Sequence, residues 1–480
     1  MNDIIGRSRE IKLLQKAVDS KKSEFVAIYG RRRVGKTFLV REFFNYSFDF
    51  QLTGLANATT KQQLTNFQIT LKRQFPTVSE AIPANWLLAF QKLIDELEKI
   101  DRTEKKVIFF DELPWLATAR SDFMLALEHF WNSWATNRKD ILLIGCGSAA
   151  AWMINQLINN HGGLHNRVTQ RIQVFPFNLY ETELMLQAKN SVLNRYQILQ
   201  LYMVMGGIPY YLDAVSPDKS ANQNIEELCF TKGGLLTVEF QNLFTSLFKN
   251  SEQSEAIVIA LASKNKGLTR SELSKKASIK SGSGLTRRLT ELEESGFIER
   301  YVPFGRKKTK VVYRLADFYS FFYLKFIKNN TNFKQGIWLN AIDKSAQRAW
   351  MGNAFEQVCL AHIPQIKQAI GISGVISDAS VWRSKRDVEI EKNGAQVDLI
   401  IDRRDQVINL CEAKFSINPF TITKSYADNL RNKIGRFQTE TNTRKAIFLT
   451  MITTYGIEKN SHAAALVQNE VQMDDLFQSL

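Results

Sequence analysis

The sequence has few cysteines and few histidines. The four cysteines, Cys146, Cys229, Cys359 and Cys411, lie far apart and form no C-x-x-C pair. This spacing argues against a disulfide framework and a zinc site, and it indicates a reducing compartment. The five histidines show no metal-ligand spacing. We therefore expect a cytoplasmic protein.

Long apolar runs are also missing. No stretch has the length that a membrane-spanning helix needs. The first residues include the acidic Asp3 and no long apolar segment, which is unlike a signal peptide. Long repeats and low-complexity segments are absent as well. We therefore expect a protein without a membrane partner.

The chain does have length, apolar content and positive charge. Its 480 residues suggest about three domains, and a hydrophobic content of 44% is enough for packed cores. The net charge of +15 favours nucleic acid or another polyanion as a partner. Composition does not separate these two classes.

The first motif is a phosphate-binding loop. Residues 25–40 read FVAIYGRRRVGKTFLV, which is an apolar strand, a G-x-x-x-x-G-K-T loop and a helix start. In such a loop the glycines let backbone N–H groups face phosphate oxygens, the lysine reaches the β and γ phosphates, and the threonine hydroxyl binds Mg²⁺. The predicted nucleoside triphosphate site comprises Gly30, Arg31, Arg32, Arg33, Val34, Gly35, Lys36 and Thr37.

A second motif, KKVIFFDELPW, begins at Lys105. Its four apolar residues predict a strand buried on both faces, which ends at Asp111 and Glu112. We expect Asp111 to hold Mg²⁺ through water and Glu112 to polarise the attacking water. An acidic pair after a strand is common by itself, but its place downstream of a phosphate loop favours this interpretation.

Three further residues are candidates for the same site. Ser148 follows a third apolar strand, ILLIGCGS, where it either senses the γ phosphate and orients water or simply forms a turn. Arg167 and Arg171 are candidates for reaching a γ phosphate, in the same subunit or a neighbouring one, although arginines are also common at surfaces.

The middle of the chain predicts a helical part and then a basic module. Residues 177–212 are helical and are interrupted by Gly206-Gly207-Ile208-Pro209. Residues 255–315 predict three helices and a hairpin, a winged helix–turn–helix, and Lys264 to Arg314 carries 14 Lys or Arg against 5 Asp or Glu. The module either binds DNA or docks on a protein. The expected DNA contacts are Arg287, Arg288, Arg306, Lys307, Lys308 and Lys310.

The last part predicts a carboxylate site. Asp398 and Glu412 fall on two apolar strands joined by a polar turn, Lys414 lies on the same strand face as Glu412, and Glu356 lies on a preceding helix. Two carboxylates that hold Mg²⁺ or Mn²⁺ beside a lysine suit phosphodiester cleavage. Buried strands carry such residues when they are paired or ligate a metal.

The order of these motifs resembles that of the archaeal-type P-loop ATPase family of the AAA+/STAND-like group. The matching features include Ile5-Gly6-Arg7 with Glu10, GRRRVGKT, FFDELPW, Arg167 and Arg171 before Pro176-Phe177, and Met205 to Pro209. The C-terminal residues Glu356, Asp398, Glu412 and Lys414 resemble a restriction-endonuclease-like PD-(D/E)xK motif, with Val397 where proline is usual. Cys146-Gly147-Ser148 departs from the two adjacent serines of many relatives.

We therefore expect an α/β chain with a P-loop parallel-sheet core (1–175), a helical lid (176–250), a winged helix (251–320), a linker (321–345) and a nuclease-like domain (346–480). The predicted function is an Mg²⁺-dependent ATPase coupled to DNA binding and DNA cleavage. The alternative is a nucleotide switch that binds DNA, a regulatory protein or further copies of itself without cleaving DNA. The resemblance implies ATP as the nucleotide.

Overall fold

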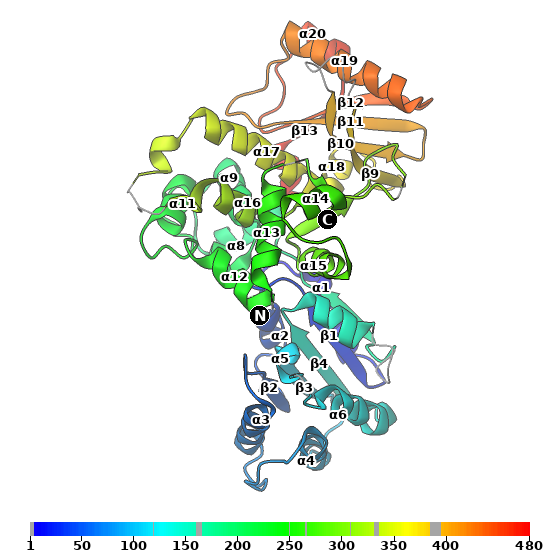
Figure 1. The fold of residues 1–480 in the computed structure, drawn as a ribbon. Coiled ribbons are helices and arrows are strands. Elements are labelled where there is room, and N and C mark those ends of the chain that lie inside the picture. Colours follow the sequence, from blue (N-terminus) through cyan, green and yellow to red (C-terminus); the bar gives the residue numbers. More distant parts are fainter. Residues whose placement is uncertain are drawn as a thin grey trace. The chain divides into compact units, whose positions relative to one another are not determined.

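A computed structural model describes residues 4–118, 120–159, 166–248, 250–264, 266–307, 309–330, 336–384 and 395–480. The chain divides into two compact units (Figure 1). Unit 1 comprises Met1–Pro176 and Glu294–Gly296, and unit 2 comprises Phe177–Glu293 and Phe297–Leu480.

Unit 1 is built on a parallel sheet. Its five described strands have the order β2-β3-β4-β1-β5. They are β1 (Glu24–Tyr29), β2 (Phe50–Thr53), β3 (Lys106–Asp111), β4 (Ile141–Gly147) and β5 (Gln170–Gln173). Because β4 lies between β1 and β3, the end of β4 is flanked by the loop after β1 and by the acidic end of β3. The predicted parallel-sheet core is confirmed.

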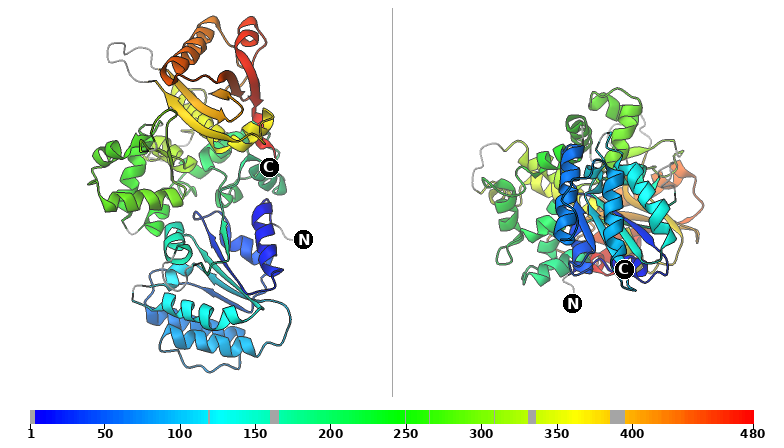
Figure 2. Two further views of the ribbon diagram at one scale, coloured as in Figure 1. Left: turned by 90° about the vertical axis from the view of Figure 1, so that its right-hand side faces the viewer. Right: turned by 90° about the horizontal axis from the view of Figure 1, so that it is seen from below.

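Helices cover both faces of this sheet. In Figure 2 (left) the sheet lies between α1 and the pair α3 and α4. Alternate strand residues, such as Phe25 and Phe110, pack against buried side chains of α3, α4 and α6. They form one apolar cluster that includes Trp86 and Phe90 of α4. The helices are α1 (Ser8–Val18), α2 (Lys36–Phe43), α3 (Thr60–Gln74), α4 (Trp86–Glu98), α5 (Leu113–Leu116), α6 (Phe123–His129) and α7 (Ala150–Trp152).

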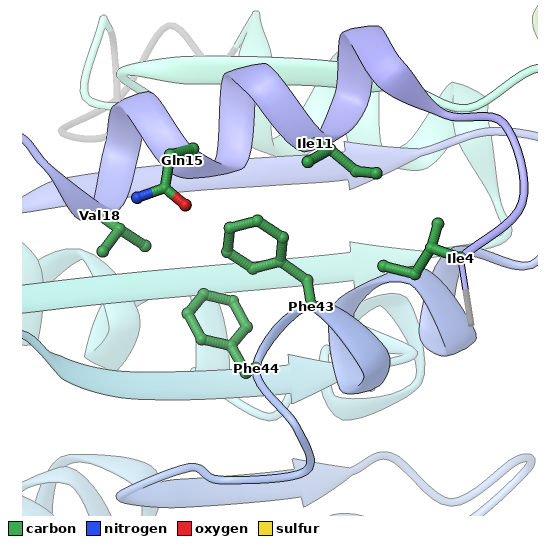
Figure 3. A pocket seen from close by; sticks show the side chains of 6 residues that line it. All are labelled: Ile4, Ile11, Gln15, Val18, Phe43 and Phe44. Atoms are coloured by element: carbon green, nitrogen blue, oxygen red, sulfur yellow. The ribbon is translucent and has the colours of Figure 1, made fainter. Parts of the chain in front are cut away.

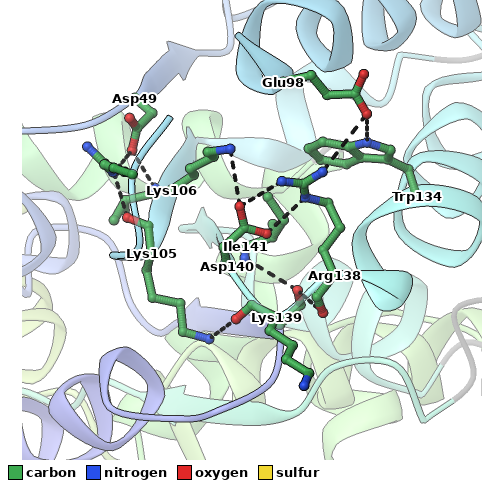
Figure 4. Close-up of polar contacts among 12 residues, drawn as sticks. Asp49, Glu98, Lys105, Lys106, Trp134, Arg138, Lys139, Asp140 and Ile141 are labelled. Carbon is green, nitrogen blue, oxygen red and sulfur yellow. Dashed lines mark hydrogen bonds and ion pairs between the residues drawn. The ribbon is translucent and has the colours of Figure 1, made fainter. Parts of the chain in front are cut away.

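A polar network lies at the end of the sheet where β3 and β4 begin (Figure 4). Asp140, just before β4, accepts two hydrogen bonds of 2.8 Å from the Arg138 guanidinium. The Nζ of Lys106, a side chain only 3% exposed, lies 3.1 Å from the same carboxylate. The hydrogen bonds from Arg138 lower the pKa of Asp140 to about 2. This network stabilises the beginnings of the two strands. The predicted nucleotide motifs lie at the opposite ends of the strands.

Unit 2 begins with helices. They are α8 (Leu179–Ala188), α9 (Arg195–Met205), α10 (Pro209–Asp213), α11 (Ala221–Phe230) and α12 (Glu239–Leu247). Between α9 and α10, Gly207 has φ 65°, and a Cβ there would lie 2.0 Å from the Phe177 carbonyl oxygen. The predicted break of the helix at the two glycines is therefore a close backbone approach that only glycine permits.

The basic module (residues 251–320) follows. It contains α13 (Ser251–Ala262), α14 (Arg270–Lys276), α15 (Ser283–Glu294) and a small antiparallel sheet of β6 (Leu268–Thr269), β8 (Val312–Leu315) and β7 (Ile298–Tyr301). Thr269 and Glu272 form a capping box at the start of α14. Phe304, in the loop of the hairpin, donates its backbone N–H to the Val381 carbonyl. The hairpin thus attaches to the C-terminal sheet.

The C-terminal sheet has the described order β13-β12-β11-β10-β9. Strands β9 (Ser377–Arg383), β10 (Gln396–Arg403) and β11 (Val407–Lys414) are antiparallel, whereas β12 (Ala446–Thr453) and β13 (Val467–Gln472) run parallel to β11. Helix α19 (Lys424–Thr441) packs Phe437 and Leu430 on the sheet. The other helices here are α16 (Phe318–Phe322), α17 (Ser345–Ala361), α18 (Ile363–Ala369) and α20 (Ser461–Leu466).

Fully buried His362 joins α17 to the start of α8 within unit 2. Its Nε2 accepts a 3.1 Å hydrogen bond from the Leu179 N–H, and its Nδ1 lies 2.8 Å from the Val358 carbonyl. Burial lowers the pKa of His362 to about 4. The ring is therefore neutral, with the proton on Nδ1.

The predicted α/β fold class, with a P-loop core, added helices and a separate C-terminal sheet, agrees with this architecture. The five-part domain division stays a prediction. Within the described ranges, no helix is both long and apolar enough to cross a membrane.

Candidate nucleotide site and C-terminal carboxylate cluster

The loop between β1 and α2 has the backbone that its glycines predict. Gly30 has φ 149°, and a Cβ there would lie 2.2 Å from the Val174 carbonyl oxygen. Gly35 has φ 85° and forms the N-cap of α2. Positive φ angles such as these are readily adopted by glycine. The two glycines therefore let the loop curl tightly against the sheet before the helix begins.

Lys36 is held inside this loop. Its side chain is buried, and its Nζ donates a 2.8 Å hydrogen bond to the Arg31 carbonyl. Burial lowers the pKa of Lys36, while nearby Cys146, Glu112 and Asp111 act in the opposite direction. The ammonium group thus lies at the centre of the loop, where a phosphate would take over its bond to the backbone carbonyl.

Thr37 and Asp111 meet across the strand ends. The Thr37 hydroxyl donates a 2.9 Å hydrogen bond to Asp111 Oδ1, and Arg41 Nη2 lies 3.8 Å from Asp111 Oδ2. Asp111 is buried at the end of β3. A hydroxyl and a carboxylate are the oxygen donors that Mg²⁺ prefers, so these two residues fit the predicted ion.

Glu112 and Ser148 also come together. Glu112 Oε2 accepts a 2.9 Å hydrogen bond from the Ser148 hydroxyl and a 3.1 Å bond from its backbone N–H. Glu112 has φ 45° and ψ 49°, an uncommon conformation for a residue other than glycine. The strand order explains the contact, because β4 ends beside β3. Ser148 therefore orients Glu112 in this structure.

Arg7 is a contributor that the predicted site residues omitted. Its guanidinium donates hydrogen bonds of 2.6 Å to the Phe175 carbonyl and 2.9 Å to the Val34 carbonyl. It thereby ties the start of α1 to the phosphate loop and to the chain after β5. The Gly-Arg pair quoted for the family resemblance was the available signal.

The two candidate arginines are less well placed. Arg171 lies on edge strand β5, paired in register with Ala27, and its side chain is exposed. Arg167 is exposed as well, and Gly163 to His165 before it lie outside the described residues. Their role at a γ phosphate stays a prediction.

A pocket of about 490 Å³ lies between α1 and the end of α2 (Figure 3). Its lining is mostly apolar and comprises Ile4, Ile11, Gln15, Val18, Phe43 and Phe44. Helix α1 supplies Ile11 and Val18 to this lining. Helix α2 therefore connects the two features: it begins at Lys36 of the phosphate loop, and Phe43 and Phe44 at its end line the pocket.

Residues 4–215 match the family described as an ATPase domain predominantly from Archaea. This part of the chain therefore resembles an archaeal-type ATPase domain. An uncharacterized protein of Methanocaldococcus jannaschii is 26% identical over 365 residues, which are 74% of this chain and 76% of that protein.

Among solved structures, the Walker-type ATPase PABY2304 of Pyrococcus abyssi has a TM-score of 0.49 and 18% identity. The match covers 67% of this chain and 96% of that chain. The Aeropyrum pernix ORC2 protein has a TM-score of 0.45 and 14% identity, covering 69% of this chain and 95% of that one.

The C-terminal strands bring the predicted carboxylates into one cluster, which comprises Glu356, Asp398 and Glu412. Strands β10 and β11 pair Leu399 with Cys411, so Asp398 and Glu412 are neighbours. Burial, and then the charge of Asp398, raise the pKa of both Glu356 and Glu412 above the usual range. The predicted proximity of these residues is confirmed.

The cluster does not have the arrangement of a metal site. Among the described residues, no group of three or more His, Cys, Asp or Glu side chains is placed to hold a metal ion. Asp398 Oδ2 accepts the Ala413 N–H at 3.2 Å, and both Glu412 oxygens lie 2.7 Å from Lys433 Nζ. The second divalent-cation site predicted for these residues stays a prediction.

Lys433 and Tyr426, both on α19, were missed by the sequence analysis. The available signal was weak: they lie seven residues apart on the helix, at helical spacing from the buried Leu430 and Phe437. Lys414 extends towards the same helix, with its Nζ 5.1 Å from the centre of the Tyr426 ring.

The predicted DNA contacts differ in exposure. Arg306, Lys307 and Lys310 of the hairpin are exposed, and Lys308 lies outside the described residues. On α15, Arg287 is exposed and lies 3.7 Å from Glu291. Arg288 is buried instead, and its Nη1 donates to the Gly284 carbonyl at 2.9 Å. Helix packing turns Arg288 inward, because it shares a face with Leu285 and Leu292.

Proposed function

We propose that the chain is an Mg²⁺-dependent ATPase whose site is formed by the phosphate loop, Asp111, Glu112 and Ser148. The observation that carries this proposal is the convergence of Lys36, Thr37, Asp111 and Glu112 at neighbouring strand ends. Bound Mg²⁺ neutralises charge on the phosphates during transfer. The apolar pocket beside α1 suits the nucleoside base.

The roles of the chain's own residues follow from their contacts. Lys36 exchanges its bond to the Arg31 carbonyl for phosphate oxygens, and the N–H groups at the start of α2 add to the positive environment. Glu112 accepts the proton of the attacking water, and Ser148 holds its carboxylate in place. A base that is positioned in this way needs little reorganisation before reaction.

ATP binding and hydrolysis are coupled to DNA in this proposal. The support is the exposed cationic hairpin of the basic module, which carries Arg306, Lys307 and Lys310. Three helices followed by an antiparallel hairpin are the element order of a winged helix. Phosphate contacts by such cations give affinity that depends on salt.

The decisive experiment is ATP hydrolysis by the full-length protein, with and without DNA, with the DNA followed on a gel in the same reactions. Hydrolysis that DNA accelerates supports the coupled function. Absence of hydrolysis under all conditions would overturn the ATPase. Hydrolysis that ignores DNA favours the nucleotide switch, in which the nucleotide state controls self-assembly or binding to a regulatory protein.

Cleavage of DNA by the C-terminal domain is a second candidate. The observation favouring it is the gathering of the carboxylate cluster beside Lys414, as in the nuclease-like motif. Linear, circular and single-stranded DNA incubated with Mg²⁺ or Mn²⁺ test it directly. If the DNA is cut, Lys414→Ala should stop cleavage and leave DNA affinity nearly unchanged; loss of both would contradict the role of Lys414.

A further inference from the structure

The carboxylate of Glu412 is already saturated by helix α19. Lys433 Nζ lies 2.7 Å from each of its oxygens, and Tyr426 donates a 3.3 Å hydrogen bond to Oε2. The side chains of Glu412 and Lys433 are only 2% and 19% exposed. A carboxylate taken out of water is costly unless it is paired and hydrogen-bonded. The ion pair therefore does for Glu412 what a bound cation would otherwise do.

Other cations of the chain face the rest of the cluster. Lys266, in the turn between α13 and β6, interacts electrostatically with both Glu356 and Asp398. The charge of Lys414 acts on Glu356 and Glu412. Among the described residues, these three lysines match the three carboxylates in number, and Arg383 adds positive charge near Lys266, so the cluster has no excess negative charge to attract a divalent cation.

We propose that the ammonium group of Lys433 is the resident counter-ion of Glu412 and excludes Mg²⁺ and Mn²⁺ from the C-terminal sheet. A cation within ligand distance of Glu412 would lie a few ångströms from Lys433 Nζ, where the two positive charges repel each other. The cluster is thus an internal ion-pair centre that joins α19 to β11. This inference does not depend on ATP hydrolysis. It is the alternative to metal-dependent DNA cleavage by the same cluster, and such cleavage with the Glu412–Lys433 pair in place would contradict it.

It follows that the C-terminal domain does not cleave DNA with Mg²⁺ or Mn²⁺ while the Glu412–Lys433 ion pair is intact. Its role is then to bind DNA or a protein. Lys266 belongs to the basic module, so the cluster also lies where that module meets the C-terminal part of unit 2. The backbone hydrogen bond from Phe304 to Val381 and the packing of Phe304 on Phe437, with ring centres 5.2 Å apart, join the same parts.

Calorimetric titration of the full-length protein with Mn²⁺, without nucleotide, tests the proposal. All proteins carry Asp111→Asn, so that the nucleotide site contributes little. We compare this background with Lys433→Met and with Lys433→Gln, which keeps a hydrogen-bond donor for Glu412. The background should bind Mn²⁺ weakly, and both variants should bind at least about tenfold more tightly, because a repelling unit charge is gone.

Two controls assign the effect to the pair. Lys445→Met removes a different half-buried lysine of the same domain, one that contacts Asp402 at 2.6 Å, and should leave Mn²⁺ binding as in the background. Adding Glu412→Gln to Lys433→Gln should abolish the gain. Tight binding by the background, or folded Lys433 variants with no gain, would overturn the proposal; melting curves establish which variants are folded.

Discussion

The nucleotide site and the carboxylate cluster are both acidic groups at strand ends, yet their neighbours differ. At the nucleotide site, Asp111 faces the hydroxyl of Thr37, which is a second oxygen donor. In the cluster, Glu412 faces the ammonium group of Lys433. An oxygen donor adds to a metal site, whereas a cation replaces the metal. An acidic side chain at a strand end therefore predicts metal binding only when the groups that contact it are known as well.

The largest effect should come from Glu112→Gln. ATP affinity should stay near that of the wild type, while kcat falls by about 10²- to 10⁴-fold, because the base is lost but the phosphate contacts remain. Phosphate release and nucleotide titration measure the two quantities. Lys36→Ala should instead abolish binding. Normal hydrolysis by Glu112→Gln would show that another group is the base; exposed Glu80→Gln is the matched control.

Arg7→Ala should lower the stability of unit 1 by about 3 kcal/mol, because it removes two charge-assisted hydrogen bonds to the carbonyls of Val34 and Phe175. Loosening the phosphate loop should also raise the ATP concentration needed for half-saturation. Urea unfolding and nucleotide titration give both numbers. Arg9→Ala, which changes an exposed arginine two residues away, should have little effect on either.

Acid should distinguish the two units. The pKa of His362 falls to about 4 in the folded protein, below its ordinary value of 6.5. Folding stability is then complete above the unfolded-state pKa and falls as pH decreases from 6.5 towards 4. The loss at pH 5 amounts to about 2 kcal/mol. Asp140 in unit 1, with a pKa of about 2, loses its contribution only between its ordinary value and pH 2.

The variant His362→Gln separates the pH-dependent contribution of His362 to folding stability from that of other groups. Because glutamine does not titrate, the difference in unfolding free energy between wild type and variant should change between pH 7 and pH 5. Denaturant titrations at both pH values measure it. A constant difference would show that His362 is not the titrating group.

The smallest effect concerns the hairpin. Lys307→Ala should weaken binding to DNA of any sequence modestly and reduce the slope of log affinity against log salt by about 1. Fluorescence anisotropy at several salt concentrations measures this slope. Exposed Lys61→Ala in unit 1 serves as the control. An unchanged slope would favour protein docking as the role of the hairpin.

The nucleotide site could be predicted closely because its signals are local. The loop from Gly30 to Thr37 needs particular residues at adjacent positions, and β3 and β4 are short apolar runs buried in the sheet. The contact between Glu112 and Ser148 was not predictable in detail, since it depends on β4 lying between β1 and β3. Likewise, the inward position of Arg288 depends on which face of α15 packs.

The sequence by itself determined the ATPase domain, the strand that carries Asp111 and the neighbouring positions of Asp398 and Glu412, because spacing and alternation act over short distances along the chain. Only the tertiary structure decided the partner of Glu412. Lys433 lies on a helix that packs across the sheet, and no local pattern specifies which charged group will meet a buried carboxylate. Desolvation makes that partner decisive, because a buried carboxylate must be paired by whichever cation the fold brings to it.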